Sequence, residues 1–174
     1  ASGLPIDGLN WKIADDGELI IKHPAVFKGY LHDVSATAKT VVDGWLHTGD
    51  LATMDADGYV TVRGRSKNML LTSSGQNIYP EEIESKLNNM PYVSESLIVL
   101  QHDKLVALIY PDFDDAFAHG LQQADIEKAM EANRNELNLL LPAYSQITKV
   151  KIHFEEFEKT AKKSIKRFMY QEAK

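Results

Sequence analysis

The sequence predicts an α+β protein: a small β-rich, barrel-like subdomain, followed by an α+β domain in which helices flank a small sheet. Short apolar runs separated by turns rich in Asp and Gly fill the first third of the chain, which is typical of closely spaced strands. Two later segments, at 80–90 and 124–141, carry apolar residues at helical spacing. The pattern changes near residues 64–68, so we expect a subdomain over 1–66 and a second domain over 67–174.

The first part is expected to contain short strands with one short helix between them. Residues 18–22 (ELIIK) follow a turn and predict a strand, and residues 34–41 predict the helix. Residues 51–54 and 59–63 flank the sequence Asp-Ala-Asp-Gly, a composition that suits a tight hairpin turn.

The second part is expected to be a helix-covered sheet. Pro80 suits the first turn of a helix, and Pro142 is expected to end the longer one. The remaining expected elements are a hairpin with strands at 97–100 and 105–110, an edge strand at 149–154, and a final short helix with Ile165, Phe168 and Met169 on its apolar face.

Composition restricts the function. The 174 residues are 44% hydrophobic and 25% charged, as in soluble globular proteins. A net charge of −6 argues against a nucleic-acid partner. No apolar run reaches membrane-spanning length and no signal-peptide pattern opens the chain, so we expect a cytoplasmic protein, with peripheral membrane association left open. The absence of cysteine excludes thiolate chemistry, and the six histidines lack metal-ligand spacing, so no metal site is expected.

Positive charge gathers at the C-terminal end of this acidic chain. Residues 158–174 carry six basic side chains and two acidic ones. Two interpretations stay open: a solvated terminal helix, or a site for the phosphate groups of a small ligand.

The hairpin around residues 55–58 brings a carboxylate toward two arginines. If Met54 pairs with Tyr59, then Asp50 lies near Arg63 and Arg65 at the open end of the ladder. Asp accepts hydrogen bonds from hydroxyl groups and Arg offers planar donors, so the pair suits a ligand site. A purely structural Asp–Arg pair is the alternative.

Several segments in the same order resemble the adenylate-forming acyl- and aryl-CoA synthetase family, which includes firefly luciferase and the adenylation domains of nonribosomal peptide synthetases. They are Gly17-Glu18-Leu19, GWLHTGD at 44–50, Gly58-Tyr59, GRSKN at 64–68 and SGQNIYPEEIE at 74–84. The run GRSKNMLLTSSGQNIYPEEIE, with EFEKTAKKSIKR near the end, is similar to bacterial long-chain fatty acyl-CoA ligases.

The resemblance implies a two-step reaction. A carboxylate attacks ATP to give an acyl-adenylate and pyrophosphate, and the CoA thiol then displaces AMP. ATP and CoA would be substrates, with Mg²⁺ accompanying ATP, although no Mg²⁺ ligand is identified here. Asp50 matches the family position that binds the ribose of ATP, and Arg65 matches a nucleotide contact. Lys67 matches the hinge about which the C-terminal domain rotates, and Gly75 lies in the loop along the pantetheine path.

One position departs from the family pattern. Members usually carry a catalytic lysine near the C-terminus in a sequence such as PKTxxGKxxR, whereas this chain has EKTAKKSIKR at 158–167. Alignment on Lys159 and Arg167 puts Ser164 at the lysine position. Lys163 is adjacent and is our candidate for the catalytic role, with Lys166 as the weaker one. A slowed adenylation step, or a site completed differently, stays open.

The chain lacks the family's Gly-rich phosphate loop and a segment large enough for an acyl pocket. We therefore expect a C-terminal fragment whose partner is the missing N-terminal adenylating domain of the same polypeptide, with a fatty acid as substrate and no activity in isolation. Two alternatives stay open: an adenylation domain that loads a carrier protein, and a non-catalytic nucleotide-binding or interaction module.

Overall fold

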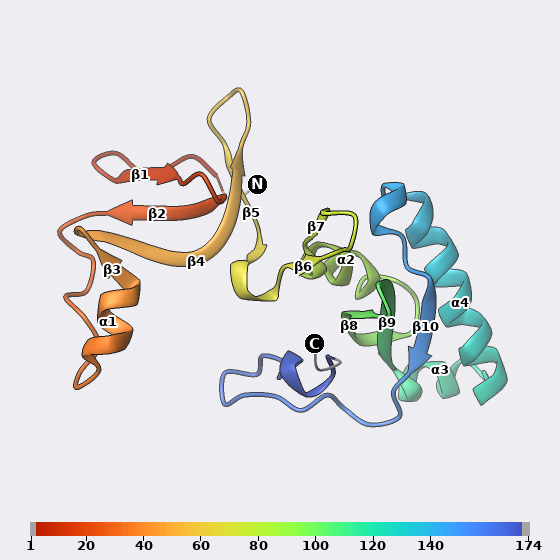
Figure 1. Ribbon diagram of the computed structural model, residues 1–174. Coiled ribbons are helices and arrows are strands. Elements are labelled where there is room, and N and C mark those ends of the chain that lie inside the picture. The colour runs from red at the N-terminus through yellow and green to blue at the C-terminus, as the bar shows by residue number, and fades with distance from the viewer. Residues whose placement is uncertain (1–2, 172–174) are drawn as a thin grey trace. The chain divides into compact units, whose positions relative to one another are not determined.

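The computed structural model describes residues 3–171, which form two compact units (Figure 1). The first unit ends at Met69 and the second begins at Leu70. Each unit has a sheet of its own, and four α-helices are distributed among the described residues. The expected α+β class is confirmed.

The first unit is an antiparallel five-stranded sheet in the order β1-β2-β4-β3, with β5 paired to the far half of β4. Within residues 3–69 this sheet stays open and does not close into a barrel. Its elements are β1 (Asn10–Ile13), β2 (Glu18–Lys22), α1 (Val34–Thr40), β3 (Val41–Val42), β4 (Trp45–Met54) and β5 (Val60–Arg65).

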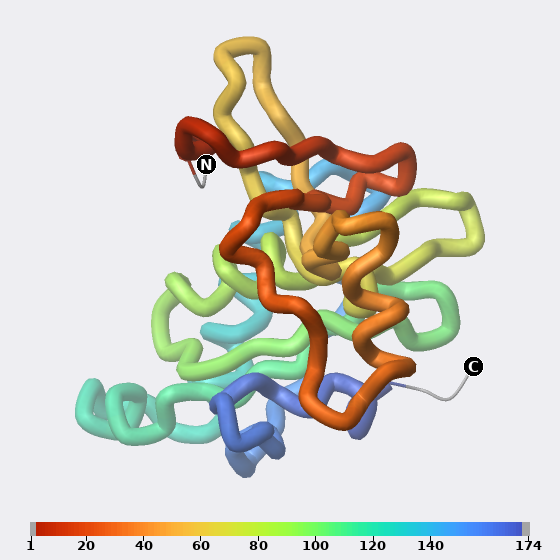
Figure 2. Tube along the Cα trace, turned by 90° about the vertical axis from the view of Figure 1, so that its left-hand side faces the viewer, coloured from red at the N-terminus to blue at the C-terminus, as the bar shows by residue number. Residues whose placement is uncertain are grey.

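The β4–β5 hairpin projects from this sheet and is visible as the long loop in Figure 2. Its turn is closed by Asp55, whose Oδ1 accepts hydrogen bonds from the backbone N–H groups of Asp57 at 3.1 Å and Tyr59 at 2.9 Å. Gly58, at φ +84°, has the left-handed backbone conformation that glycine adopts without strain. The side chain and the glycine together stabilise the tight turn that the composition predicts.

The register of this hairpin differs from the expected one. Met54 pairs with Val60 rather than with Tyr59. An irregularity between Leu51 and Ala52 then shifts the pairing by one residue, so that Asp50 lies directly opposite Arg65.

The second unit contains a three-stranded mixed sheet in the order β10-β9-β8. Strands β8 (Val93–Gln101) and β9 (Lys104–Pro111) form an antiparallel hairpin, and β10 (Lys149–Ile152) is a parallel edge strand. His102 and Asp103 connect β8 to β9, and their φ values of +48° and +60° are those of a type I′ turn. A separate small hairpin joins β6 (Leu70–Leu71) to β7 (Asn77–Ile78).

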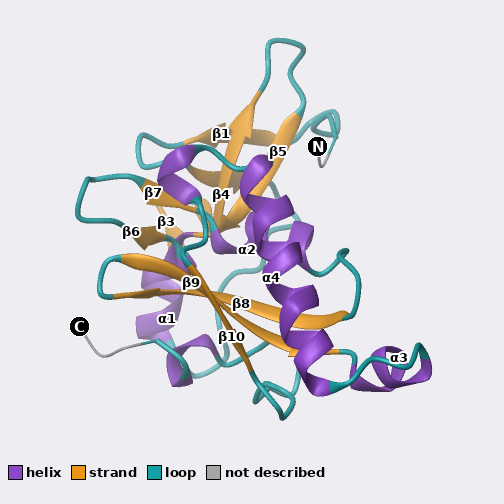
Figure 3. Cartoon of the chain, turned by 90° about the vertical axis from the view of Figure 1, so that its right-hand side faces the viewer, coloured by secondary structure: helices purple, strands orange, loops and turns teal. Residues whose placement is uncertain are grey.

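Helices α2 (Pro80–Leu87) and α4 (Gln123–Leu139) cover one face of this sheet (Figure 3). Pro80 opens α2, as expected, and Ile83 and Leu87 point into the core. Met130 of α4 is fully buried. The third helix of this unit, α3 (Phe113–Ala118), follows β9.

The C-terminal segment covers the opposite face of the sheet. Phe157, only 2% exposed, packs with an apolar row of β8 and β9 that includes Leu97 and Val106. Both strands are therefore buried on both sides, which explains their nearly continuous apolar sequence.

The prediction of a final short helix is wrong. Residues Arg167–Met169 form a single 3₁₀ turn, η3, in which Phe168 is 76% exposed and Met169 is 52% exposed. Of the three residues expected on the apolar face, Ile165 packs against the cluster around Phe157. No helix among residues 3–171 combines the length and apolar character needed to cross a membrane.

Candidate functional site

Asp50 and Arg65 meet at the open end of the β4–β5 hairpin. Arg65 Nη1 donates to Asp50 Oδ1 at 2.5 Å and to the carbonyl oxygen of Thr48 at 3.2 Å. Both side chains stay partly accessible, at 30% for Asp50 and 50% for Arg65. An exposed ion pair contributes little to stability, so these groups remain available to a ligand that presents hydroxyls and phosphates.

Glu18 of β2 fixes the backbone on which Asp50 stands. Its Oε1 accepts a hydrogen bond from Gly49 N at 2.6 Å, and its Oε2 lies 2.7 Å from His47 Nδ1. Gly49 has φ +73°, a backbone conformation that favours glycine. Thr48 adds a second tie, because its hydroxyl donates to Leu19 O at 2.6 Å. Glu18 lies in one of the sequence motifs, but its hydrogen bond to Gly49, 31 positions away, is visible only in the fold.

Lys67 lies in a short 3₁₀ turn, η1 (Ser66–Asn68), directly before the end of the first unit at Met69. Its side chain is exposed. The position fits a connection between units, and its role as a hinge stays a prediction.

Gly75 lies in the connection between β6 and β7. Thr72 closes this loop: its N–H donates to Gln76 O at 3.1 Å, and its carbonyl oxygen accepts from Gly75 N at 2.9 Å. Gly75 has φ +78°, and a Cβ atom built there would have open space around it. Within the described structure the backbone conformation is therefore what favours glycine, because no neighbouring atom crowds the position.

The same loop is tied to the β8–β9 turn. Ser73 N donates to Asp103 Oδ1 at 2.8 Å, and the Ser73 hydroxyl donates to Asp103 Oδ2. These hydrogen bonds, from the hydroxyl first and then from the backbone N–H, lower the pKa of the Asp103 carboxyl below its usual value. Local sequence patterns gave no signal for this contact, since the two residues are 30 positions apart.

Lys163 lies at the tip of a tight turn in the C-terminal segment. Its N–H donates to Thr160 O at 2.8 Å, and Thr160 N donates to Ser164 O at 2.8 Å. Lys163 has φ +60°, a left-handed conformation that costs energy for residues other than glycine. The pattern PKTxxGKxxR has its glycine at this position, so the backbone supports the alignment that puts Ser164 at the lysine position.

The lysines that flank this turn are engaged by carboxylates. Lys159 Nζ lies 2.7 Å from Glu95 and 3.1 Å from Glu156. Its hydrogen bonds to these two groups, that to Glu95 first, raise the pKa of Lys159. Lys166 Nζ lies 3.4 Å from Glu158. Within residues 3–171, the structure shows no such side-chain pair for Lys163.

A buried ion pair joins the C-terminal segment to α2. Arg167 contacts Glu84 Oε2, and Glu84 Oε1 accepts a hydrogen bond from Ile98 N at 2.7 Å. Burial raises the pKa of the Glu84 carboxyl, and the charge of Arg167 opposes that rise. Glu84 and Arg167 are 83 positions apart, so their pairing is visible only in the fold.

Asp50 and Arg65 are thus brought together, while the other candidates are separate. Gly75 lies in the β6–β7 connection and Lys163 in the C-terminal segment, which are separate segments of the second unit. Residues 3–171 contain no group of three or more His, Asp or Glu side chains that could hold a metal ion.

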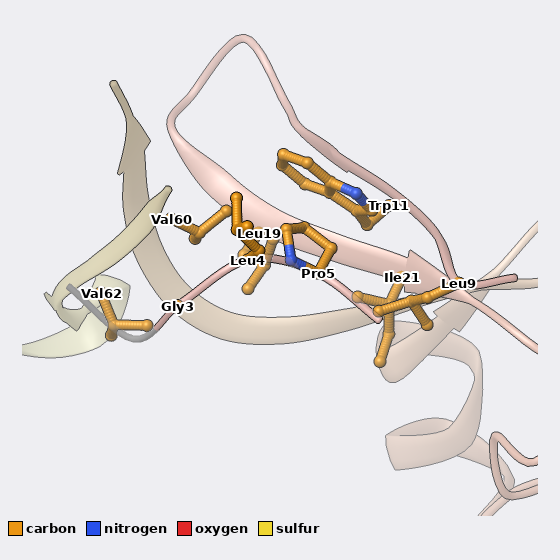
Figure 4. A pocket seen from close by; sticks show the side chains of 9 residues that line it. All are labelled: Gly3, Leu4, Pro5, Leu9, Trp11, Leu19, Ile21, Val60 and Val62. Carbon is orange, nitrogen blue, oxygen red and sulfur yellow. The ribbon is translucent and has the colours of Figure 1, made fainter. Parts of the chain in front are cut away.

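A hollow of about 170 Å³ opens in the first unit, lined by apolar side chains (Figure 4). Trp11 and Ile21 form part of its wall, with Val60 and Val62 at the other end. None of the expected site residues lines it, and its wall offers no acid, base or nucleophile.

Comparison with known proteins places this geometry in a family. The family model described as "AMP-binding enzyme C-terminal domain" matches residues 67–173. A long-chain-fatty-acid–CoA ligase of Mycobacterium tuberculosis is 40% identical over 97 residues, which are 56% of this chain and 16% of that protein. A 2-succinylbenzoate–CoA ligase of Listeria innocua is 41% identical over 103 residues, which are 59% of this chain and 22% of that protein. The chain thus spans about a sixth to a fifth of the length of these relatives.

Two solved structures are similar to this chain in fold. An anthranilate CoA ligase in complex with anthranoyl-AMP aligns over 98% of this chain and 33% of its own, with a TM-score of 0.78 and 27% identity. The adenylation domain of a carboxylate reductase from Mycobacterium chelonae aligns with a TM-score of 0.81 at 16% identity over 97% of this chain and 30% of its own, which shows a shared fold. From the family model that covers residues 67–173, the chain belongs to the AMP-binding enzyme C-terminal domain family.

Proposed function

We propose that this chain is the C-terminal part of an ATP-dependent, AMP-forming ligase that joins a long-chain fatty acid to CoA. The observation that carries the proposal is the Asp50–Arg65 pair. The two residues lie directly opposite each other on β4 and β5, and both belong to motifs that resemble the family's nucleotide contacts. The long-chain acid is suggested by the mycobacterial relative. Other relatives are named for different acids, such as 2-succinylbenzoate and indoleacetate.

In this proposal the first unit binds the nucleotide and the second unit serves both half-reactions. Asp50 accepts hydrogen bonds from the ribose hydroxyls of ATP, and Arg65 holds Asp50 in place while offering donors to the nucleotide. Lys67 absorbs the backbone rotation that lets the second unit present two faces in turn. The loop around Gly75 serves thioester formation, because the bare backbone of glycine allows the pantetheine arm to approach closely. Mg²⁺ would enter with ATP.

Lys163 supplies the positive charge during adenylation. Negative charge accumulates at the phosphates as the carboxylate attacks, and a nearby cation lowers that barrier. Lys166 is a poorer candidate, because it already lies near Glu158. Lys163 is exposed at the tip of its turn, beside the serine that replaces the usual lysine.

Half-reaction assays on the polypeptide that carries this chain test the proposal. Pyrophosphate release measured with fatty acids of increasing length, in the presence of ATP, is expected to be fastest with long chains. CoA is then expected to convert the adenylate to acyl-CoA. Faster turnover of a short or aromatic acid would contradict the substrate, and transfer to a carrier protein instead of CoA would support a carrier-loading enzyme.

Site variants separate the roles. Asp50→Ala is expected to raise the KM for ATP, with Asp7→Ala as an exposed carboxylate control in the same unit. Lys163→Ala is expected to slow pyrophosphate release, with Lys162→Ala as the control one residue away. If neither Lys163→Ala nor Lys166→Ala slows that step, the assignment of the lysine fails. ATP binding without pyrophosphate release by the unmodified protein would favour a non-catalytic nucleotide-binding module.

A further inference from the structure

The loop at residues 72–76 extends beyond the core that holds its two strands, in which Leu70 and Ile78 are buried. It connects β6 and β7, which are two residues each and pair only with one another. The loop's own hydrogen bonds run among Thr72, Ser74, Gly75 and Gln76. These bonds set the shape of the loop, and the core fixes the bases of β6 and β7, but residues 73–76 are exposed and lie outside that core.

The β8–β9 turn, in contrast, is fixed by well-buried strands. Pairing continues from Val93 with Pro111 to Gln101 with Lys104, directly beside the turn. A two-residue type I′ connection leaves almost no freedom in the position of its two residues. A side chain on this turn is therefore held in place by the core of the second unit.

Asp103 occupies a turn position at which glycine would be the least strained residue. It has φ +60°, and type I′ turns strongly favour Gly at this second position. A carboxylate there brings local strain, so its contacts are the place to look for a compensating role. Both of its oxygens face Ser73: Oδ1 accepts from the backbone N–H at 2.8 Å, and Oδ2 accepts from the hydroxyl.

We propose that Asp103 is a positioning residue, which holds the 72–76 loop in the orientation that thioester formation requires. The inference rests on the proposed function, because it takes from there the role of the Gly75 loop. Asp103 touches neither substrate nor reacting atoms. It acts through Ser73, two residues from Gly75, and transmits the rigidity of the β8–β9 hairpin to the loop.

The first experiment needs no enzymatic activity. Asp103→Gly removes the carboxylate while leaving a residue that fits the positive φ, so the turn and the fold are expected to survive. In the 174-residue chain, amide hydrogen exchange at Ser73 and Gln76 is expected to accelerate about tenfold or more. Lys104→Ala, at the adjoining exposed position, is the control and is expected to leave both rates unchanged. Unchanged exchange in Asp103→Gly would overturn the proposal.

The second experiment separates the two half-reactions in the polypeptide that carries the chain. With preformed acyl-adenylate and CoA, Asp103→Gly is expected to lower kcat for thioester formation about tenfold, while pyrophosphate release stays within about twofold. Ser73→Ala is expected to produce a smaller loss, and adding it to Asp103→Gly should cost little more, because both act through one contact.

The outcomes separate a failure of the positioning role of Asp103 from a failure of the proposed ligase function. Faster loop exchange with an unchanged thioester step, in an enzyme whose unmodified form makes acyl-CoA, overturns the positioning role and leaves the ligase assignment standing. Equal losses in both half-reactions overturn it too, because they indicate a general structural defect. An unmodified polypeptide that performs neither half-reaction refutes the proposed function.

Discussion

The two units are stabilised in different ways. In the first, four hydrophobic side chains among residues 3–69 are buried, namely Ile20, Leu51, Ala52 and Val60. In the second, both faces of the sheet are covered, one by α2 and α4 and the other by the segment around Phe157. The first unit therefore depends more on polar ties such as Glu18 to Gly49, and the second on apolar packing.

This difference shows how each unit places its functional groups. The backbone next to Asp50 is held by the Glu18 carboxylate and the Thr48 hydroxyl. The position of Asp50 therefore depends on a few hydrogen bonds. The loops of the second unit extend from a closed core and need only local anchors, such as Asp103 for one loop and Arg167 for the other.

Separating the units is the strongest challenge to this comparison. Residues 70–174 expressed alone are expected to unfold cooperatively in urea, since they contain a core on both faces of a sheet. Residues 1–69 alone are expected to show no cooperative transition, because so small a buried core cannot offset the entropy of chain ordering. Circular dichroism across a urea series measures both. A sharp transition in residues 1–69 would show that the polar ties suffice.

Phe157→Ala tests the second face of the sheet. Loss of this fully packed ring is expected to cost about 4 kcal/mol of unfolding free energy. Phe154→Ala is the matched control, because Phe154 is 60% exposed, and it should cost less than about 1 kcal/mol. Chemical denaturation of both variants gives the comparison, and equal costs would mean that the C-terminal segment adds little to the core.

Arg167→Met probes the buried ion pair and its dependence on pH. At about pH 7 the substitution is expected to cost about 3 kcal/mol, because it leaves the Glu84 carboxylate buried without its partner. Burial already holds the pKa of Glu84 above 4.5, so the contribution of this group to stability is full below that value and is lost as pH rises through the folded pKa.

Removing Arg167 takes away the charge that lowers this pKa, so the pKa rises further. Glu84 can then accept a proton more readily as pH falls and escape part of the penalty, so the cost of Arg167→Met is expected to be smaller at low pH than at about pH 7. Urea unfolding of both proteins at the two pH values measures the difference. A cost that does not change with pH would mean that Glu84 stays charged.

Glu18→Ala has the smallest expected effect and examines the polar ties of the first unit. Two contacts are lost, to Gly49 N and His47, with an expected cost of about 1–2 kcal/mol. Amide exchange at Gly49 should accelerate, while exchange in β8 stays unchanged. Asp7→Ala, an exposed acidic control, should alter neither, and a similar change in that variant would remove the special role of Glu18.

Strong local patterns made much of the second unit predictable. The helical spacing at 80–90 and 124–141 and the apolar strands around His102 and Asp103 correspond to α2, α4 and the β8–β9 hairpin. In the first unit the pairing of Asp50 was anticipated only approximately. A one-residue irregularity in the ladder decides between Arg63 and Arg65, and no local pattern encodes it.

Long-range contacts set the limit of such predictions. Ser73 with Asp103 and Glu84 with Arg167 join positions 30 and 83 residues apart, and no local pattern in the sequence pairs them. The prediction of a final helix was wrong because the spacing of Ile165, Phe168 and Met169 was taken as one buried face, whereas Ile165 packs beside Phe157 and the other two side chains are exposed.

The turn at residues 160–164 has a consequence for how this protein tolerates mutation. Phe157 on one side and Arg167 on the other pin the C-terminal segment, while the side chains of Lys162, Lys163 and Ser164 are exposed. Folding therefore places little demand on the identity of Lys162 and Ser164, whereas the φ of +60° at Lys163 favours glycine. Substitutions at positions 162 and 164 can accumulate through genetic drift without loss of the native state, and a residue preference that saturation mutagenesis reveals at these two positions reports on activity.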